Sequence, residues 1–276
     1  MPGRVSWIAL RITPETNREG VIAALFESGS QGIQEDGAAV ITHFPSDTHI
    51  DDIRDAIIDA DPHAAIAVAD APDTDYSQRR ALVSAHRVGD LVITPPWLAD
   101  GFDPHNTVIV DPAMAFGTGE HATTRGAMRL MQGLIRPGDV VADLGAGSAV
   151  LSIAAVKLGA SRVAAVEIDP DAIGNAEENI RANGVSNNVE VIEGDATVIL
   201  PLLSPVRVVI ANIISSVIIP LLPVMKSSLT GDGQAILAGI PTEERDAMLS
   251  ALSAGGWTVE REDTEDVWWS AQIAPC

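Results

Sequence analysis

The chain of 276 residues has 46% hydrophobic residues and a net charge of −21, from 38 acidic and 17 basic residues. This hydrophobic fraction argues against disorder, and the length suits a folded, enzyme-sized protein with room for two domains. The single cysteine is the last residue, Cys276, which excludes a disulfide framework and a cysteine-based zinc site, argues against a thiol nucleophile and favours a reducing compartment.

Charge and hydropathy also limit the partners. A strongly acidic surface repels phosphate backbones and anionic lipid, so we expect no direct nucleic acid partner and no membrane binding. The N-terminus lacks the apolar core of a secretory signal, and polar residues and prolines interrupt the longest uncharged stretch, 208–225. We expect a cytoplasmic monomer that attracts a basic partner, although the acidity could equally serve solubility or the ionic conditions of the cell.

The first 71 residues predict a small α+β domain. Strand patterns cover 6–13, 31–36, 38–44 and 64–71, and helical patterns cover 16–29 and 51–62. This β-α-β-β-α-β order is that of a ferredoxin-like domain. Nothing within 1–71 has a catalytic pattern, so we interpret it as a substrate-recognition or packing domain. Residues 72–90 are weakly periodic and predict a linker.

Residues 91–276 predict a second, larger α/β domain. After two short strands, at 90–97 and 106–112, helices and strands alternate to a closing antiparallel hairpin at 257–274. The helices are expected at 123–135, 149–159, 170–184, 215–229 and 243–256, and the strands at 139–145, 162–169, 188–194, 206–212 and 234–240. Such alternation is typical of a doubly wound, Rossmann-like parallel sheet.

A glycine turn containing Gly145 and Gly147 follows the first strand of this sheet. A dinucleotide site would have a third glycine where this chain has Val150, and Asp143 at the strand end would repel a diphosphate. Both features argue against NAD and FAD. They favour a ligand with a positive end, such as the ammonium and sulfonium groups of S-adenosylmethionine. The alternative is a tight turn whose strand-end acid caps a helix.

Two further acids end neighbouring strands. Glu167 follows Gly145 by 22 residues, where a carboxylate can accept hydrogen bonds from both ribose hydroxyls. Asp195 follows the third strand, where it could accept a hydrogen bond from the adenine amino group. A loop or helix-cap role is the alternative for Asp195.

Three segments carry a family resemblance: DPAMAFGTGEHATTR at 111–125, the glycine-turn region 143–185, and VVIANII at 208–214. Together they resemble the ribosomal protein L-eleven methyltransferase family, and the resemblance covers nearly the whole chain. It implies a small N-terminal recognition domain before a class I methyltransferase domain. The implied activity moves methyl groups from S-adenosylmethionine to lysine and N-terminal amines of the basic large-subunit protein eleven.

The resemblance also implies roles for individual residues. The cofactor-binding positions would be Thr124, Gly145, Glu167 and Asn212. The segment Phe116, Gly117 and Thr118 would line the methyl-transfer pocket, with Gly117 also beside the cofactor. The chain departs from the family at Ala149, where a glycine is usual, at Glu167, where an aspartate is usual, and in a linker without tryptophan.

Asn212 ends the fourth strand, and its amide oxygen can accept a hydrogen bond from an incoming amine. Ile213, Ile214 and Ser215 replace the proline-proline-aromatic turn that clamps planar bases, which favours an aliphatic amine. Asn212 could alternatively cap the following helix. We interpret His121 as a residue that orients its loop. The other histidines lack ligand spacing, so no metal site is expected.

Three other functions remain open at this point. The enzyme could methylate a lysine of another protein, such as the electron-transfer flavoprotein beta subunit. It could be a nicotinamide-dependent oxidoreductase, against which Asp143 and Val150 argue. It could also be a binding module that retained the fold without catalysis, although FGTG, the glycine turn and Asn212 are all present.

Overall fold

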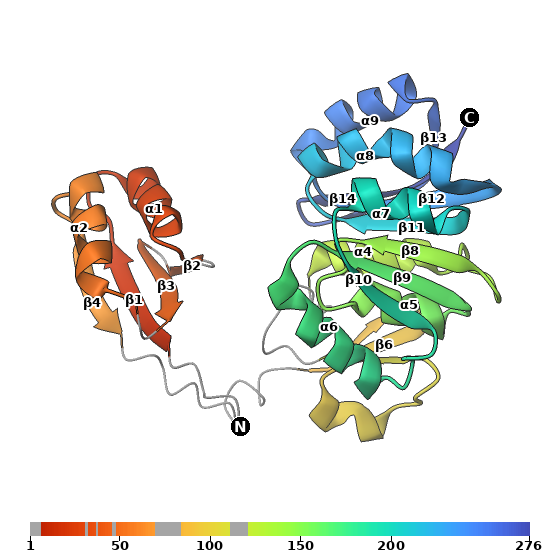
Figure 1. Ribbon diagram of the computed structural model, residues 1–276, viewed down its shortest axis with the longest axis horizontal. Helices are drawn as coiled ribbons and strands as arrows, with labels where there is room; N and C mark the ends of the chain where they lie inside the picture. Colours follow the sequence, from red (N-terminus) through yellow and green to blue (C-terminus); the bar gives the residue numbers. More distant parts are fainter. Residues whose placement is uncertain (1–6, 31–32, 37, 46–47, 70–83, 111–120) are drawn as a thin grey trace. The chain divides into compact units, whose positions relative to one another are not determined.

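The computed structural model describes residues 7–30, 33–36, 38–45, 48–69, 84–110 and 121–276. The chain divides into two compact units, residues 1–83 and 84–276. Each has its own hydrophobic core, and Figure 1 shows the elements of both. The division falls inside the segment 72–90 that the sequence predicts as a linker.

The first unit is a four-stranded antiparallel sheet with two helices, in the chain order predicted for a ferredoxin-like domain. Its elements are β1 (Trp7–Thr13), α1 (Arg18–Glu27), β2 (Ile33–Asp36), β3 (Ala39–Pro45), α2 (Ile50–Ala60) and β4 (Ala65–Ala69). The strands lie in the order β2-β3-β1-β4. Alternate residues of β1 point to one face, where they share a core with both helices: Leu10, Ile12, Val21, Leu25, Ile53 and Ile57.

The carboxylate of Asp61 fastens the start of α1 to the end of α2. Asp61 follows α2, and its Oδ2 accepts hydrogen bonds from the backbone N–H groups of Glu15 and Thr16, both at 2.8 Å, and of Asn17 at 3.0 Å. The Thr16 N–H makes the largest contribution to a pKa of Asp61 well below its usual range. The charge of Asp61 therefore stabilises this corner of the unit.

The second unit begins with a three-stranded sheet of β5 (His86–Val88), β6 (Leu91–Thr94) and β7 (Thr107–Ile109), with the 3-10 helix η1 (Pro96–Gly101) between β6 and β7. Its main sheet has seven strands in the order β10-β9-β8-β11-β12-β14-β13. These are β8 (Val140–Leu144), β9 (Arg162–Glu167), β10 (Val189–Glu193), β11 (Val206–Asn212), β12 (Leu229–Pro241), β13 (Trp257–Glu265) and β14 (Trp268–Pro275). Six of these strands run in one direction and β14 runs in the opposite direction, so the predicted doubly wound α/β sheet is confirmed.

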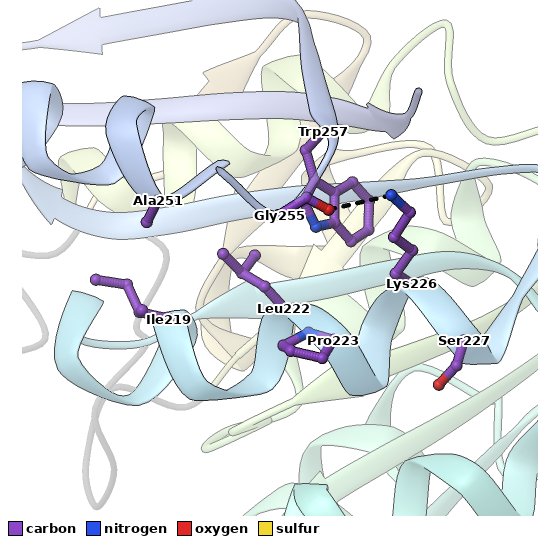
Figure 2. Close-up of a pocket in the computed structure, with 8 residues that line it drawn as sticks. All are labelled: Ile219, Leu222, Pro223, Lys226, Ser227, Ala251, Gly255 and Trp257. Atoms are coloured by element: carbon purple, nitrogen blue, oxygen red, sulfur yellow. Dashed lines mark hydrogen bonds between the residues drawn. The ribbon is translucent and has the colours of Figure 1, made fainter. Parts of the chain in front are cut away.

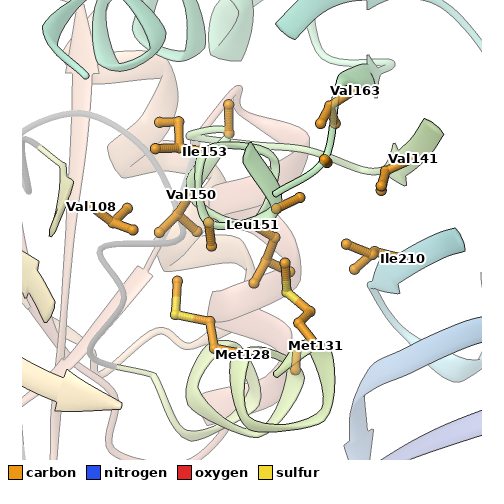
Figure 3. Close-up of a cluster of buried hydrophobic side chains, with 14 of the residues drawn as sticks. Val108, Met128, Met131, Val141, Val150, Leu151, Ile153, Val163 and Ile210 are labelled. Atoms are coloured by element: carbon orange, nitrogen blue, oxygen red, sulfur yellow. The ribbon is translucent and has the colours of Figure 1, made fainter. Parts of the chain in front are cut away.

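Helices cover both faces of this sheet. They are α4 (Ala122–Met131), α5 (Val150–Lys157), α6 (Pro170–Ala182), α7 (Ala196–Leu203), α8 (Ser215–Ser228) and α9 (Arg245–Ala254), the last preceded by the 3-10 helix η2 (Thr242–Glu244). Side chains of β11 alternate between two cores: Val208 and Ile210 pack with α4, α5 and α6, whereas Val209 and Ala211 pack with α7, α8 and α9. Figure 3 shows part of the first core, around Met128, Leu151 and Ile210.

The structure differs from the sequence prediction in three places. Helix α7 was not predicted, because Pro201 interrupts a short apolar run that has no clear helical period. Strand β5 lies inside the predicted linker. Strand β12 begins at Leu229 and not at residue 234, through a glycine-rich stretch that weakens the strand pattern. Among the described residues, no helix is long and apolar enough to span a membrane.

Candidate functional site

The predicted site residues gather at one edge of the main sheet. Asp143 and Asn212 lie at the carboxyl ends of β8 and β11, Glu167 ends β9, and Asp195 follows β10. Strand β8 lies between β9 and β11, so the chain continues to one side of β8 first and to the other side later. Such a switch point opens a crevice at the carboxyl ends of the strands, where α/β proteins bind ligands.

The glycine turn closes tightly at the end of β8. Gly145 and Gly147 have φ angles of 71° and 52°, a region that glycine enters without the steric cost of a Cβ. A Cβ on Gly145 would lie 2.4 Å from Cγ2 of Ile213. The turn therefore lies directly against the segment after β11, and this close approach requires the glycine.

Asp143 is a buried carboxylate, with 1% of its surface exposed. Its Oδ2 accepts a hydrogen bond of 2.6 Å from the hydroxyl of Ser152 in α5. Burial raises the pKa of Asp143 to about 6; hydrogen bonds from Ser152 oppose this rise, and the nearby charge of Glu167 adds to it. Among the described residues no cation pairs with Asp143, so this arrangement favours a ligand that brings a positive charge.

Glu167 bridges β9 and the glycine turn. Its Oε2 accepts a hydrogen bond from the Gly147 N–H at 2.8 Å, and its Oε1 accepts from the N–H groups of Ile168 and Asp169 at 2.8 and 3.0 Å. A carboxylate offers about four acceptor positions. Two ribose hydroxyls can therefore bind Glu167 together only if one of these backbone hydrogen bonds is released.

Asp195 is exposed and caps helix α7. Its Oδ1 accepts hydrogen bonds from the N–H and the hydroxyl of Thr197, both at 2.7 Å. The hydroxyl contributes most to lowering the pKa of Asp195. The cap role that the sequence left open is therefore present. Within the described part of the chain Oδ2 has no hydrogen bond, so the predicted bond to an adenine amino group is compatible with the cap.

Asn212 and Thr124 meet across the crevice. The Asn212 amide nitrogen lies 3.5 Å from Oγ1 of Thr124, a fully buried residue of α4. The amide oxygen of Asn212 has no hydrogen bond among the described residues, so it remains able to accept one from an N–H group. Asn212 does not cap the following helix, because the N-cap of α8 is Ile214, without a side-chain bond. The alternative cap role of Asn212 is wrong.

His121 is the N-cap of helix α4. Its Nδ1 accepts a hydrogen bond from the Thr123 N–H at 3.4 Å, and its ring meets that of Trp268 edge to face at 5.0 Å. Burial, followed by the charge of Arg125, lowers the pKa of His121. A neutral ring suits this cap, because a protonated Nδ1 could not accept. The predicted orienting role is thus a helix cap beside Thr124.

Two arginines and one glycine hold α4 against the closing hairpin. Arg125 binds Glu265, and Nε of Arg129 donates to Oδ2 of Asp263 at 2.7 Å. A Cβ on Gly126 would lie 2.7 Å from the Ser270 hydroxyl, so the helix packs closely on β14. These contacts were not predicted from the sequence, since they join residues more than 130 positions apart. They hold the helix that carries Thr124 against β13 and β14.

Other expected site residues cannot be placed. Phe116, Gly117 and Thr118 lie in 111–120, outside the described residues. Within the described segments no group of three or more histidine, cysteine or acidic side chains could hold a metal ion.

A cavity of about 400 Å³ lies elsewhere, between α8 and α9. Figure 2 shows its mostly apolar lining, which includes Leu222 and Trp257 and none of the predicted site residues. Lys226 donates hydrogen bonds to the carbonyl groups of Gly255 and Gly256, at 3.1 and 2.8 Å. The lysine thus stabilises the end of α9.

Sequence comparisons match the chain to one protein family. The profile of the family described as ribosomal protein L11 methyltransferase (PrmA) matches residues 7–274. A relative of that name from Symbiobacterium thermophilum is 35% identical over 83% of this chain and 74% of its own length. A relative from Lacticaseibacillus paracasei is 30% identical over 95% of this chain and 96% of its own length. One from Pelotomaculum thermopropionicum is 41% identical over 64% of this chain, and the match spans 58% of that relative.

Solved structures show the same fold. The ribosomal protein L11 methylase of Lactobacillus delbrueckii subsp. bulgaricus matches with a TM-score of 0.63 and 28% identity, over 70% of this chain and 99% of that one. A precorrin-6y C5,15-methyltransferase from Geobacter metallireducens shares the fold alone. It is 20% identical, with a TM-score of 0.52, over 61% of this chain and 97% of that one. The larger unit therefore has the class I methyltransferase fold, and the chain belongs to the ribosomal protein L11 methyltransferase (PrmA) family.

Proposed function

We propose that this chain transfers methyl groups from S-adenosylmethionine to lysine and N-terminal amines of ribosomal protein L11. The observation that supports this most directly is the buried carboxylate of Asp143, which lies beside a glycine turn and has no cation among the described residues. A nicotinamide dinucleotide would bring a diphosphate towards this carboxylate, and like charges at close range repel. The family membership favours methyl transfer independently.

The residues at the sheet edge fit this cofactor, which supplies a methyl group on a sulfonium. Asp143 would hold its ammonium group, and Glu167 would accept from the ribose hydroxyls after releasing one backbone N–H. Asp195 would accept from the adenine amino group through Oδ2. Gly145 keeps the turn close to the crevice, because the side chain of Ile213 occupies the space that a Cβ on this residue would need. Thr124 would contribute through its contact with Asn212.

Methyl transfer needs an aligned, neutral amine more than it needs a base. A lysine with an ordinary pKa of about 10.4 is almost fully charged near pH 7, and an apolar pocket beside a sulfonium lowers that pKa. We assign to the Asn212 amide oxygen the task of accepting from the amine N–H, so that the lone pair points at the methyl. Phe116, Gly117 and Thr118 would line this pocket, which we expect to be apolar around Phe116.

The net charge of −21 favours a basic substrate. Opposite charges speed association at low ionic strength, and salt screens this attraction. The first unit, with no catalytic pattern of its own, would recognise the substrate protein. We further propose that the enzyme acts as a monomer in the cytoplasm. If the acidic surface steers the substrate, methylation rates at low substrate concentration fall as salt is added.

The test mixes the purified chain with isotope-labelled S-adenosylmethionine and unmodified ribosomal protein L11. Intact-mass spectrometry should show gains in steps of one methyl, and peptide mapping should place them on lysine side chains or the N-terminus. Asn212→Ala serves as the matched low-activity control. Labelling of another protein in a cell extract, such as the electron-transfer flavoprotein beta subunit, with none on L11 would reject this substrate while keeping the reaction.

A further inference from the structure

Asp143 has one side-chain partner among the described residues, the hydroxyl of Ser152. The two atoms lie 2.6 Å apart, and Ser152 is fully buried in the first turn of α5. Water cannot easily replace a hydrogen bond between two buried groups, so losing this bond leaves the acceptor unsatisfied. Ser152 thus acts on the charge state and on the orientation of this carboxylate.

The remaining surroundings of Asp143 offer its charge little support. Its register neighbours in the sheet are Ala165 of β9 and Ile210 of β11, both apolar. Within the described segments, the one other charged group that acts on it is the carboxylate of Glu167, which repels it. The nearby helix α4 carries two arginines, at 125 and 129, but these bind the acids of the closing hairpin.

We propose that Ser152 is a positioning residue for cofactor binding: its hydroxyl aims the Asp143 carboxylate and supports its negative charge, so that the cofactor ammonium meets a charged acceptor. This inference rests on the proposed function, since it needs a cofactor with an ammonium group. The sequence gives only a weak signal for it, a single serine in the otherwise apolar first turns of a helix, nine residues after the acid.

The proposal links cofactor binding to a proton. With a pKa of about 6 in the free protein, Asp143 is protonated in about half of the molecules at pH 6. Binding of the ammonium requires the carboxylate form, so the proton moves from the Asp143 oxygen to the solvent. Cofactor affinity should therefore be constant above about pH 7 and fall below about pH 6. We call the pH at which the affinity begins to fall the bend. Without the Ser152 hydroxyl the bend should lie about one pH unit higher.

The experiment is calorimetric titration of the full chain with S-adenosylhomocysteine between pH 5 and 7.5. Buffers of different ionisation enthalpy report the protons released. Wild type should release about half a proton at pH 6. The bend should lie lowest in wild type, higher in Ser152→Cys and highest in Ser152→Ala, because a thiol is a weaker donor than a hydroxyl and alanine has no donor. Ser228→Ala, which removes another buried hydroxyl far along α8, is the matched control and should keep the wild-type bend.

The possible results separate the two proposals. If wild type takes up no S-adenosylhomocysteine at any pH, the proposed function fails. If wild type binds it but Ser152→Ala weakens affinity equally at every pH, the serine is only structural and the positioning role is overturned. An upward shift of the bend and of the proton release in Ser152→Ala, absent from Ser228→Ala, supports the proposal.

Discussion

Replacing Asp143 with asparagine should stabilise the cofactor-free protein. The substitution keeps the shape of the side chain and leaves an oxygen to accept from Ser152, but it removes a charge from a site that is 1% exposed. The pKa of Asp143 is raised from 3.8 to about 6. At about 1.4 kcal/mol per pH unit, ionisation of the buried carboxylate costs the folded protein about 3 kcal/mol above pH 6.

The sign and the pH window follow from this raised pKa. A group that binds its proton more tightly in the folded state stabilises the fold at low pH, and this stability is lost as pH rises towards 6. Wild type should therefore lose stability relative to Asp143→Asn between about pH 4 and pH 6. The gap, which is the difference in free energy of unfolding between the two proteins, should then stay constant. Between pH 4.5 and pH 7.5 the gap should grow by about 2 kcal/mol.

The assay is urea unfolding followed by tryptophan fluorescence, which reports mainly on the second unit through Trp97, Trp257, Trp268 and Trp269. The change of the gap with pH is the readout, because packing differences between the two side chains do not depend on pH. Asp195→Asn is the matched control. The pKa of this exposed acid is lowered, so its effect on stability is lost only below about pH 4, and its difference from wild type should stay nearly constant between pH 4.5 and pH 7.5. A gap for Asp143→Asn that stays constant from pH 4.5 to 7.5 would refute the reasoning.

Three other substitutions test the remaining parts of the account. Asn212→Ala should lower kcat by about 10- to 100-fold, as expected for one lost orienting hydrogen bond, while calorimetry shows nearly unchanged cofactor affinity; a weakened affinity with normal kcat would contradict the assigned role. Gly145→Ala should cost more than about 1 kcal/mol in urea unfolding and disturb cofactor binding, because its Cβ would meet Ile213 at 2.4 Å and its φ is 71°; wild-type behaviour would show that the turn has room. Asp61→Asn should speed hydrogen exchange at the amides of residues 15–17 at pH 7. Because the folded-state pKa of Asp61 is lowered, the difference in exchange rate from wild type should shrink as pH falls below 4. Equal exchange rates at pH 7 would show that Asp61 does not hold the start of α1 to the end of α2.

Hydrophobic periodicity predicted most of the fold because each element buries one consistent face. Alternation along β11, with Val208 and Val209 in opposite cores, is visible in the sequence as a continuous apolar run between helices. Helix α7 escaped prediction because Pro201 and a short apolar run give no clear period. The strand β5 is too short, at three residues, to stand out from a linker.

The placement of the candidate acids and of Asn212 at one edge of the sheet was predictable, since strand ends in a parallel sheet meet there. The contacts among these candidate residues were less visible. The hydrogen bond between Ser152 and Asp143 joins a helix to a strand, and the bond between Asn212 and Thr124 joins residues 88 positions apart. Such contacts depend on how elements pack, which periodicity does not encode. The roles of Phe116, Gly117 and Thr118 stay predictions.

Cofactor binding, as we propose it, depends on Asp143 acting as the acceptor of a cation. The most direct measurement compares S-adenosylhomocysteine with its analogue lacking the amino group, each titrated into wild type and Asp143→Asn at pH 7.5. We expect removal of the amino group to weaken binding to wild type by about 10- to 150-fold, the effect of one charge-assisted hydrogen bond, and to matter little in Asp143→Asn. Equal losses in both proteins would contradict the central claim.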